Sequence, residues 1–270
     1  MEHQLWKLIV VYLEQLGKLR FNPRQRYSDL RILEVYFWAV LHDRPVCWAC
    51  CRANWPIHLQ KEALPSNSCM SRRLRSTLVK QLLAEGEARL VRRSEAGGLV
   101  WFLDGKPLTI SGCSRDRQAG YGRAASCKAK GYKLHALVGA DGSLAAWRLA
   151  PMNTDERVMA ERLLQTAHVQ GYIVTDSNYD SNRLHALCNE RNNRQMVTPR
   201  RYGKNKGIGH RRQTSGRLRS KAILENPFAE FGEDLQHQRG SIERFFGNVT
   251  NWGGGLTHLP PWVRTYRRVY

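Results

Sequence analysis

The spacing of the hydrophobic residues changes near residue 93, and this change constrains the fold more than any other feature of the chain. Before it, residues such as Leu5, Ile9 and Leu16 recur at intervals of four and seven, as they do on one face of a helix. After it, short apolar runs alternate with turn residues and separate helical segments. The sequence therefore predicts a helical region over 1–93 and an α/β domain over 94–270.

The helical region contains a candidate DNA-recognition helix at 71–82, which follows a predicted helix that begins at the capping residue Ser28. Arg72, Arg73 and Arg75 lie opposite an apolar stripe in this segment. Such a helix can pack its stripe inward while the arginines contact phosphates and guanine edges in a major groove. The same pattern fits an amphipathic helix with a solvated basic face, and the sequence leaves both interpretations open.

The second half of the chain has a clear order of predicted elements. These are a strand at 99–103, a hairpin around Asp141-Gly142, a helix at 154–167, a strand at 172–175, a helix at 184–190 and a strand at 195–197. This order places the strands at 99–103 and 172–175 centrally if the fold is a ribonuclease H-like mixed sheet with flanking helices, which is the fold class we expect. Asp104 and Asp176 would then follow directly after two central strands, where functional side chains gather.

The charge of the chain indicates a polyanionic partner. Lys and Arg number 43 and Asp and Glu number 23, which gives a net charge of +20 and favours nucleic acid over a small-molecule substrate. A membrane partner is not expected, because the longest apolar run, Val35–Leu41, is far shorter than the ~20 residues of a spanning helix. An odd number of cysteines, 7, and the lack of a signal-peptide pattern predict a cytoplasmic protein.

A basic segment at 200–221 interrupts the α/β pattern. It contains nine Lys or Arg residues and no acid, and its composition predicts a loop that contacts the DNA backbone. The arginines expected to make these contacts are Arg211, Arg212, Arg217 and Arg219.

Three carboxylates are candidates for catalysis, whereas Asp155, Glu156 and Asp180 are interpreted as acids at helix N-termini. Asp104 and Asp176 would repel each other on neighbouring strands unless a divalent cation lay between them. Glu243 lies at the edge of the apolar stripe of a predicted helix at 239–249, from which it could point across the sheet. Three carboxylates without a histidine or cysteine set suit Mg²⁺ better than Zn²⁺.

Five sequence blocks carry a resemblance to a known family. They are "FLDGKPL" around Asp104, "KGYKLHALVGADG" at 130–142, "PMNTDER" at 151–157, "VTDSNYDS" at 174–181 and "RGSIERFFG" at 239–247. In this order the chain resembles the DDE transposases of bacterial insertion sequences, in the group with a Tyr-Arg-Glu-Lys signature. Arg239 and Glu243 match that signature, whereas Gln236 and Thr250 stand where it has Tyr and Lys.

The resemblance implies a function and a set of roles. Asp104 would bridge two Mg²⁺ ions, for which Mn²⁺ can substitute, and Asp176 and Glu243 would each complete one. The site would cut a strand at the end of the element and use the freed 3′-hydroxyl to attack target DNA. Lys130 and Lys133 would lie close to Asp104 on the adjacent strand and hold a phosphate of the DNA, which Arg239 would also contact.

The resemblance also implies the partners and the location of the protein. The partners would be terminal inverted repeats, target DNA and further copies of the chain in a homo-oligomer on DNA, with the protein at the nucleoid. Two alternatives stay open at this point. One is a ribonuclease H-like nuclease without strand transfer, and the other is a catalytically inactive DNA-binding remnant of a transposase.

Overall fold

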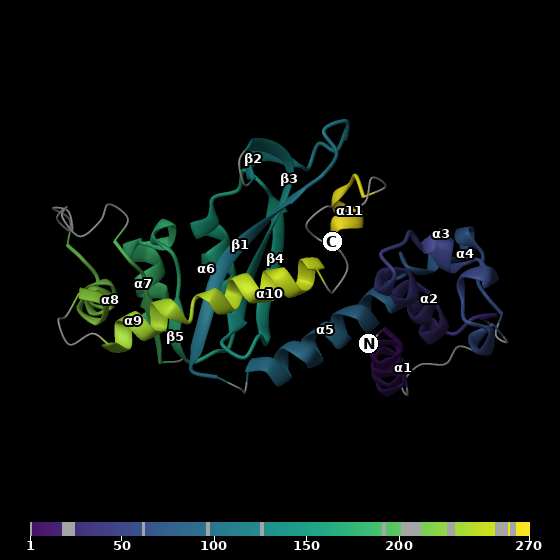
Figure 1. The fold of residues 1–270 in the computed structure, drawn as a ribbon, viewed down its shortest axis with the longest axis horizontal. Helices are drawn as coiled ribbons and strands as arrows, with labels where there is room; N and C mark the ends of the chain where they lie inside the picture. The colour runs from purple at the N-terminus through teal and green to yellow at the C-terminus, as the bar shows by residue number, and fades with distance from the viewer. Residues whose placement is uncertain are drawn as a thin grey trace. The chain divides into compact units, whose positions relative to one another are not determined.

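The computed structural model describes residues 2–17, 25–60, 63–95, 98–124, 127–190, 193–200, 212–225, 230–251, 259 and 263–270. The chain divides into two compact units, the first ending at Leu90 and the second beginning at Val91. Figure 1 shows helices alone in the first unit, and a sheet covered by helices in the second. None of the described helices is both long and apolar enough to cross a membrane.

The first unit is built from α1 (Glu2–Gly17), α2 (Asp29–Leu41), α3 (Val46–Ala49), α4 (Asn67–Arg73) and α5 (Thr77–Glu95), with 3₁₀ turns η1 (Arg52–Asn54) and η2 (Ile57–Leu59). Three tryptophans form the centre of its core. The ring centroids of Trp38 and Trp55 are 4.8 Å apart, and Trp6 meets Trp38 edge-on at 4.9 Å. Ser28 caps α2 as the sequence predicts, because its Oγ accepts a hydrogen bond from the Arg31 N–H at 3.1 Å.

The single helix predicted at 71–82 is wrong. α4 ends at Arg73, and α5 begins at Thr77 after a short turn. Ser76 favours this new start, since its Oγ accepts a hydrogen bond from the Val79 N–H at 3.4 Å in the manner of an N-cap. Arg72 and Arg75 therefore do not lie on one helix with the apolar residues of α5.

The second unit contains one mixed sheet. Its strands are β1 (Val100–Thr109), β2 (Gly120–Ala124), β3 (Cys127–Gly139), β4 (Leu144–Pro151), β5 (Gly171–Val174) and β6 (Arg194–Val197). Their order is β2-β3-β1-β5-β6, with β4 also paired to β3. β1 runs antiparallel to β3 and parallel to β5, and β5 runs parallel to β6. The predicted ribonuclease H-like α/β fold is confirmed.

Helices cover both faces of this sheet. They are α6 (Glu156–Thr166), α7 (Asn182–Asn189), α8 (Ser215–Glu225), α9 (Glu230–His237), α10 (Gly240–Asn251) and the short α11 (Tyr266–Val269), with the 3₁₀ turn η3 (Ser177–Tyr179). Alternate residues of β1 enter two different cores: Trp101 and Leu103 pack with α6 and α7, while Phe102 packs with α9 and α10. Asp104 follows Phe102 by two residues and so projects on the α10 face.

The predicted strand end at Asp104-Gly105 is wrong, because β1 continues through both residues to Thr109. Pairing with β3, from Trp101 opposite Gly139 to Thr109 opposite Gly131, overrides the local turn signal. The strand that does end here is the neighbour β5, whose last paired residue is Val174. β2 was not predicted, because two of its five residues are glycine and hide any apolar alternation.

The basic segment at 200–221 is not a loop throughout. Residues 201–211, and with them Arg211, lie outside the described part of the chain. Residues 215–221, however, form the first part of α8, which packs along β6. The loop prediction is wrong for that part, because basic composition alone does not report the contact with the sheet.

Candidate active site

The sheet brings Asp104 and Asp176 together. In the parallel pair of β1 and β5, Phe102 lies opposite Val174, and Asp104 and Asp176 each follow this pair by two residues. The charge of Asp176 acts on Asp104, so the two carboxylates lie within electrostatic range of each other. The Tyr172 N–H donates to the Leu99 carbonyl, so the backbone groups of Leu99 face β5. Because the direction of the backbone groups alternates along a strand, those of Gly105 face the same edge of β1, beyond the end of β5. β5 and β6 both end at this level, with Val174 opposite Val197, whereas β1 continues past Asp104 to Thr109.

Asp104 is the most strongly perturbed carboxylate of this region. Burial raises the pKa of Asp104 from 3.8 to about 6, and the negative charges of Asp176 and Glu156 act in the same direction. The Gly105 N–H, which donates to Asp104 Oδ1 at 2.7 Å, and the charge of Arg239 lower the pKa in part. A group with these properties, held in a fixed direction by a strand, is a candidate catalytic carboxylate.

Glu156 is a site residue that the sequence prediction missed as such. It lies in the first turn of α6, which is capped by Asp155, and was interpreted only as an acid that favours a helix N-terminus. Its carboxylate binds the Lys133 Nζ at 2.5 Å. The side chain of Lys133 crosses Gly105, where an added Cβ would lie only 2.8 Å from Lys133 Cδ. Gly105 thus leaves the space through which Lys133 reaches Glu156 next to Asp104.

Glu243 lies in the first turn of α10, with its side chain exposed to solvent. Its neighbour Ile242 packs on the sheet, and Arg239, in the turn that precedes α10, acts electrostatically on Asp104. Within the residues that the structure describes, no three His, Cys, Asp or Glu side chains lie close enough together to form a metal site. Asp176, Glu156 and Arg239 thus act on Asp104 through their charges, while Glu243 lies exposed in the first turn of α10.

Tyr179 is a further residue that the sequence prediction missed. It is fully buried, at 0% exposure, in the turn that follows Asp176. Burial raises its pKa, and the charges of Asp104, Glu156 and Asp176 add to this effect, so the phenol stays protonated among the carboxylates. Its hydroxyl has no hydrogen-bond partner within the described residues. The sequence signal was the tyrosine three residues after a candidate catalytic aspartate.

Asp180 is not the helix N-terminal acid that the sequence predicted. The N-cap of α7 is Ser181, while Asp180 is buried and binds the Arg217 guanidinium through bonds of 2.7 and 2.6 Å. His185 Nε2 lies 3.5 Å from the same carboxylate. Arg217, expected to contact DNA, is therefore turned inward, and its pair with Asp180 fastens α8 to the segment that follows Asp176.

Two of the other basic candidates have structural partners. Arg73 binds Asp29 at 2.6 Å and donates to the Tyr27 carbonyl at 3.0 Å, and its side chain is only 16% exposed. Lys130 donates to the Ser114 carbonyl at 2.7 Å. It lies six residues along β3 from the residue opposite Asp104, or roughly 20 Å at the rise of a strand. The expectation that Lys130 lies close to Asp104 is therefore wrong, whereas Lys133 does lie there.

The remaining arginines of the prediction are exposed. Arg72 and Arg75 are exposed in the first unit, and Arg212 and Arg219 are exposed in the second. Arg75 also donates to the Ser71 carbonyl at 2.7 Å, which leaves its outer face open to solvent.

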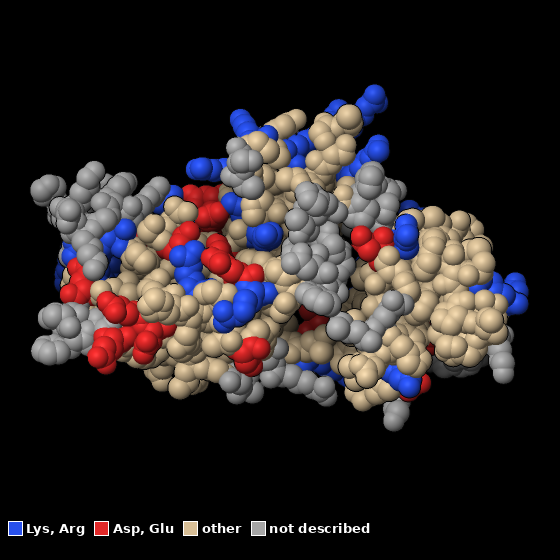
Figure 2. All heavy atoms as spheres, viewed as in Figure 1, with Lys and Arg blue, Asp and Glu red and all other residues tan. Residues whose placement is uncertain are grey.

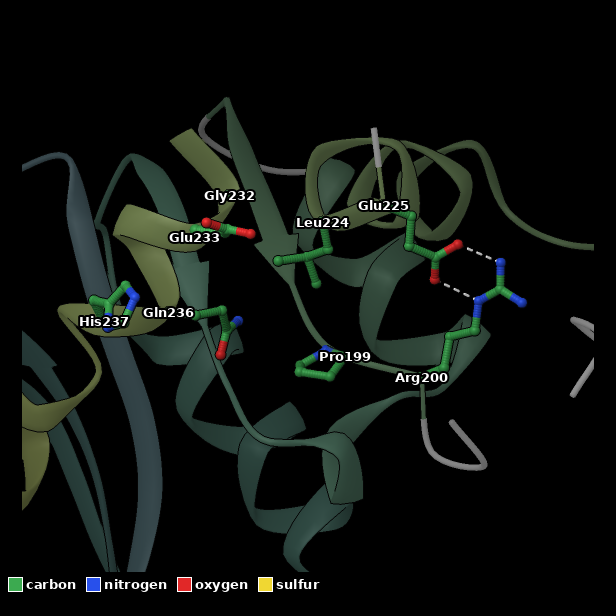
Figure 3. A pocket seen from close by; sticks show the side chains of 8 residues that line it. All are labelled: Pro199, Arg200, Leu224, Glu225, Gly232, Glu233, Gln236 and His237. Atoms are coloured by element: carbon green, nitrogen blue, oxygen red, sulfur yellow. Dashed lines mark hydrogen bonds and ion pairs between the residues drawn. The ribbon is translucent and has the colours of Figure 1, made fainter. Parts of the chain in front are cut away.

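A pocket of about 560 Å³ lies between the end of β6, α8 and α9, away from the carboxylates (Figure 3). At the edge of this pocket, the Arg200 guanidinium and the Glu225 carboxylate form an ion pair joined by two hydrogen bonds. Gln236, which stands where the signature of the resembling group has Tyr, also lines this pocket. Neither aspartate of the candidate site contributes to its lining.

A mixed sheet in the order β2-β3-β1-β5-β6, flanked by helices, defines the second unit as a ribonuclease H-like domain. The family model described as "Transposase DDE domain" matches residues 95–269. Because this match spans more than half of the 270 residues, the chain belongs to the DDE transposase family. No curated protein matches the chain.

The perturbed carboxylate leads to a prediction about stability in the absence of metal. Because the pKa of Asp104 is raised from 3.8 to about 6, the folded chain binds this proton more tightly than the unfolded chain does. The associated stability is present at low pH and is lost as the pH rises from about 4 to about 6. We therefore expect Asp104→Asn to stabilise the EDTA-treated protein at pH 7.5 by up to about 3 kcal/mol, with a smaller gain at pH 5. Urea denaturation at both values measures this, and Asp234→Asn on the exposed side of α9 is the control.

A second prediction concerns Arg73. Its removal leaves the buried Asp29 carboxylate without its ion-pair partner, so Arg73→Ala should lower the free energy of unfolding by about 3 kcal/mol. The matched variants Arg72→Ala and Arg75→Ala remove exposed arginines and should stay within about 0.5 kcal/mol of the parent. Thermal denaturation of the three variants decides whether Arg73 is structural, and equal melting temperatures would contradict this role.

Proposed function

We propose that the chain is the transposase of a bacterial insertion sequence. It binds the terminal inverted repeats of its element, cuts a DNA strand there and joins the freed 3′ end to target DNA. The observation that carries this proposal is the meeting of Asp104 and Asp176 between β1 and β5, in a domain that belongs to the DDE transposase family.

The oxygen donors of these carboxylates are of the kind that a divalent cation, Mg²⁺ or Mn²⁺, prefers. Asp176 and Glu156, which act on Asp104, offer carboxylate oxygens, which these ions prefer. A positive ion would favour the charged form of Asp104, which burial and these two negative charges disfavour. Asp104, Asp176 and Glu243 are the residues that would hold two such ions. When bound, two ions supply an activated water and a stabilised leaving oxygen for phosphodiester chemistry.

The other site residues position the substrate. Asp104 keeps its direction because the Gly105 N–H holds one of its oxygens. Arg239 provides positive charge near Asp104, where the scissile phosphate must lie. Lys133, whose ammonium lies against Glu156, can turn toward the same phosphate and keeps a neutral pair with Glu156 until DNA arrives.

The basic surfaces would bind the DNA. Arg72 and Arg75 remain candidates for contacts of the helical region 1–93 with the terminal repeats, whereas Arg212 and Arg219 are candidates for backbone contacts in the domain 94–270. The chain would act as a homo-oligomer on DNA at the nucleoid, without a small-molecule substrate.

A strand-transfer assay tests the proposal. The full chain is incubated with a terminal-repeat duplex, supercoiled target plasmid and Mg²⁺, and the products are separated under denaturing conditions. Joined products support the transposase. Cleavage without joining would instead indicate a ribonuclease H-like nuclease, and binding without cleavage would indicate an inactive DNA-binding remnant.

A further inference from the structure

Residues 105–130, which run from the second half of β1 through β2 into β3, carry an excess of positive charge that has no assigned role at the carboxylate site. Residues 105–130 contain six Lys or Arg and a single acid, Asp116. Arg115, Arg117, Arg123 and Lys128 are exposed, and no acid among the described residues pairs with any of them. Figure 2 shows Lys and Arg side chains along the upper edge of the view, over β2 and the connection that leads to it.

Two of these cations face each other directly. Arg123 of β2 lies opposite Lys128 of β3 in the antiparallel register, so their side chains share one face of the hairpin. Like charges in this position destabilise a hairpin. An anion that lies between or over the two side chains would reduce the electrostatic repulsion between them.

The C-terminal segment adds further arginines to the same place. The Ser114 hydroxyl donates to the Arg264 carbonyl at 2.7 Å, and the Tyr266 N–H donates to Asp116 Oδ2 at 2.8 Å. The rings of Tyr266 and Tyr132 are 5.5 Å apart, which packs the segment onto β3. This docking places the exposed Arg264 and Arg267 beside the 110–119 connection.

Asp116, the single acid within residues 105–130, has a structural role. Its carboxylate accepts hydrogen bonds from the Tyr132 hydroxyl, the Gln118 N–H and the Tyr266 N–H. Both oxygens are therefore engaged within the protein. Asp116 links the 110–119 connection, β3 and the C-terminal segment.

We propose that Arg115, Arg117, Arg123, Lys128, Arg264 and Arg267, here called the basic edge, bind the phosphate backbone of the DNA duplex that enters the carboxylate site, and that Asp116 holds the C-terminal part of this edge in place. The inference rests on the proposed function, because it supplies a contact surface for the same DNA. Backbone contacts carry no sequence information, so the edge binds any duplex.

The distance from the carboxylates suits one continuous duplex. β1 leads from Asp104 to Thr109 in five residues, which is roughly 17 Å along the strand. That length corresponds to about five base pairs of duplex, so a single DNA end can touch both the carboxylates and the basic edge.

The salt dependence of DNA binding by the full chain tests the basic edge. Affinity for a 30-base-pair duplex of arbitrary sequence is measured in EDTA over a range of salt concentrations, because each phosphate contact contributes about −0.9 to the log–log slope. Arg115→Ala with Arg117→Ala, and separately Arg264→Ala with Arg267→Ala, should each flatten the slope by up to about 2. The matched control is Arg162→Ala with Arg183→Ala, which removes two exposed arginines from α6 and α7 and should leave the slope nearly unchanged.

For Asp116→Ala, the basic edge predicts a change in DNA affinity opposite to the one expected from charge alone. Removal of a negative charge should strengthen DNA binding if Asp116 only repels phosphate. If Asp116 holds the C-terminal segment, the variant should instead lose affinity severalfold and show a slope like that of the Arg264 and Arg267 variant. The arginine variants keep the proposal testable if Asp116→Ala does not fold.

The outcomes separate this inference from the proposed function. Flattened slopes for both arginine pairs, with the control unchanged, support the basic edge. Unchanged slopes for both pairs in a chain that still cuts and joins DNA would overturn the basic edge and leave the transposase standing. A chain that binds no duplex at any salt concentration would overturn both.

Discussion

Replacement of Asp104 or Asp176 by Asn is expected to reduce strand cleavage by about a thousandfold or more, while DNA affinity changes by no more than a few-fold. The amide keeps the size of the side chain but loses the negative charge that would hold a divalent cation. Such an ion contributes several kcal/mol of transition-state stabilisation, and each 1.36 kcal/mol corresponds to about a factor of ten in rate. Single-turnover cleavage of a terminal-repeat duplex and binding of the same duplex in EDTA measure the two effects.

The stability of the variant distinguishes lost chemistry from lost structure. Asp104→Asn should cut DNA poorly and yet be more stable than the parent at pH 7.5 without metal, because burial and the neighbouring charges disfavour the Asp104 carboxylate. An inactive variant that is also less stable would indicate a folding defect. Retention of more than about a tenth of the parental cleavage rate would remove Asp104 from the catalytic set.

Much of the fold could be predicted because it is encoded locally. The hairpin at Asp141-Gly142 forms as expected, and Gly142 adopts the positive φ, 84°, that its turn requires. The parallel strand before Asp176 was predicted from its short apolar run, whose last two residues, Ile173 and Val174, are buried. These elements depend on residues that are neighbours in the sequence.

The errors occur where distant residues decide the outcome. β1 passes through Asp104-Gly105 because nine successive residues pair with β3, and local sequence cannot report this pairing. Arg73 and Arg217 look like solvated cations in sequence, but each has a buried aspartate as partner, 44 and 37 residues away. Sequence position thus shows where cations are, whereas only the fold shows which of them face solvent.

The candidate site divides in the same way. Asp104 and Asp176 were proposed because each follows an apolar run, and in the structure the charge of Asp176 acts on Asp104. Glu156 could not be assigned, since an acid in the first turn of a helix has a sufficient local explanation. Glu156 is linked to the Asp104 region through the Lys133 side chain, which crosses Gly105. This contact joins α6, β3 and β1, which are separate in the sequence.

The two glutamates near this site lead to the last prediction, because the third catalytic carboxylate can be decided between them. Arg239 lies in the turn before α10 and acts electrostatically on Asp104, and Glu243 lies in the first turn of that helix. Its exposed carboxylate has no hydrogen bond or ion pair among the described residues and is available to a cation that enters with DNA. Glu156, in contrast, already neutralises Lys133.

We therefore expect Glu243→Gln to reduce cleavage by about a hundredfold or more at saturating DNA, with little change in the affinity for duplex. Glu156→Gln should keep the rate at saturating DNA within about tenfold, and should tighten duplex binding because Lys133 loses its internal partner and can turn to phosphate. Cleavage rates at saturating DNA and affinities in EDTA separate the two roles. The opposite pattern, with Glu156→Gln inactive and Glu243→Gln active, would replace Glu243 by Glu156 as the third carboxylate beside Asp104 and Asp176.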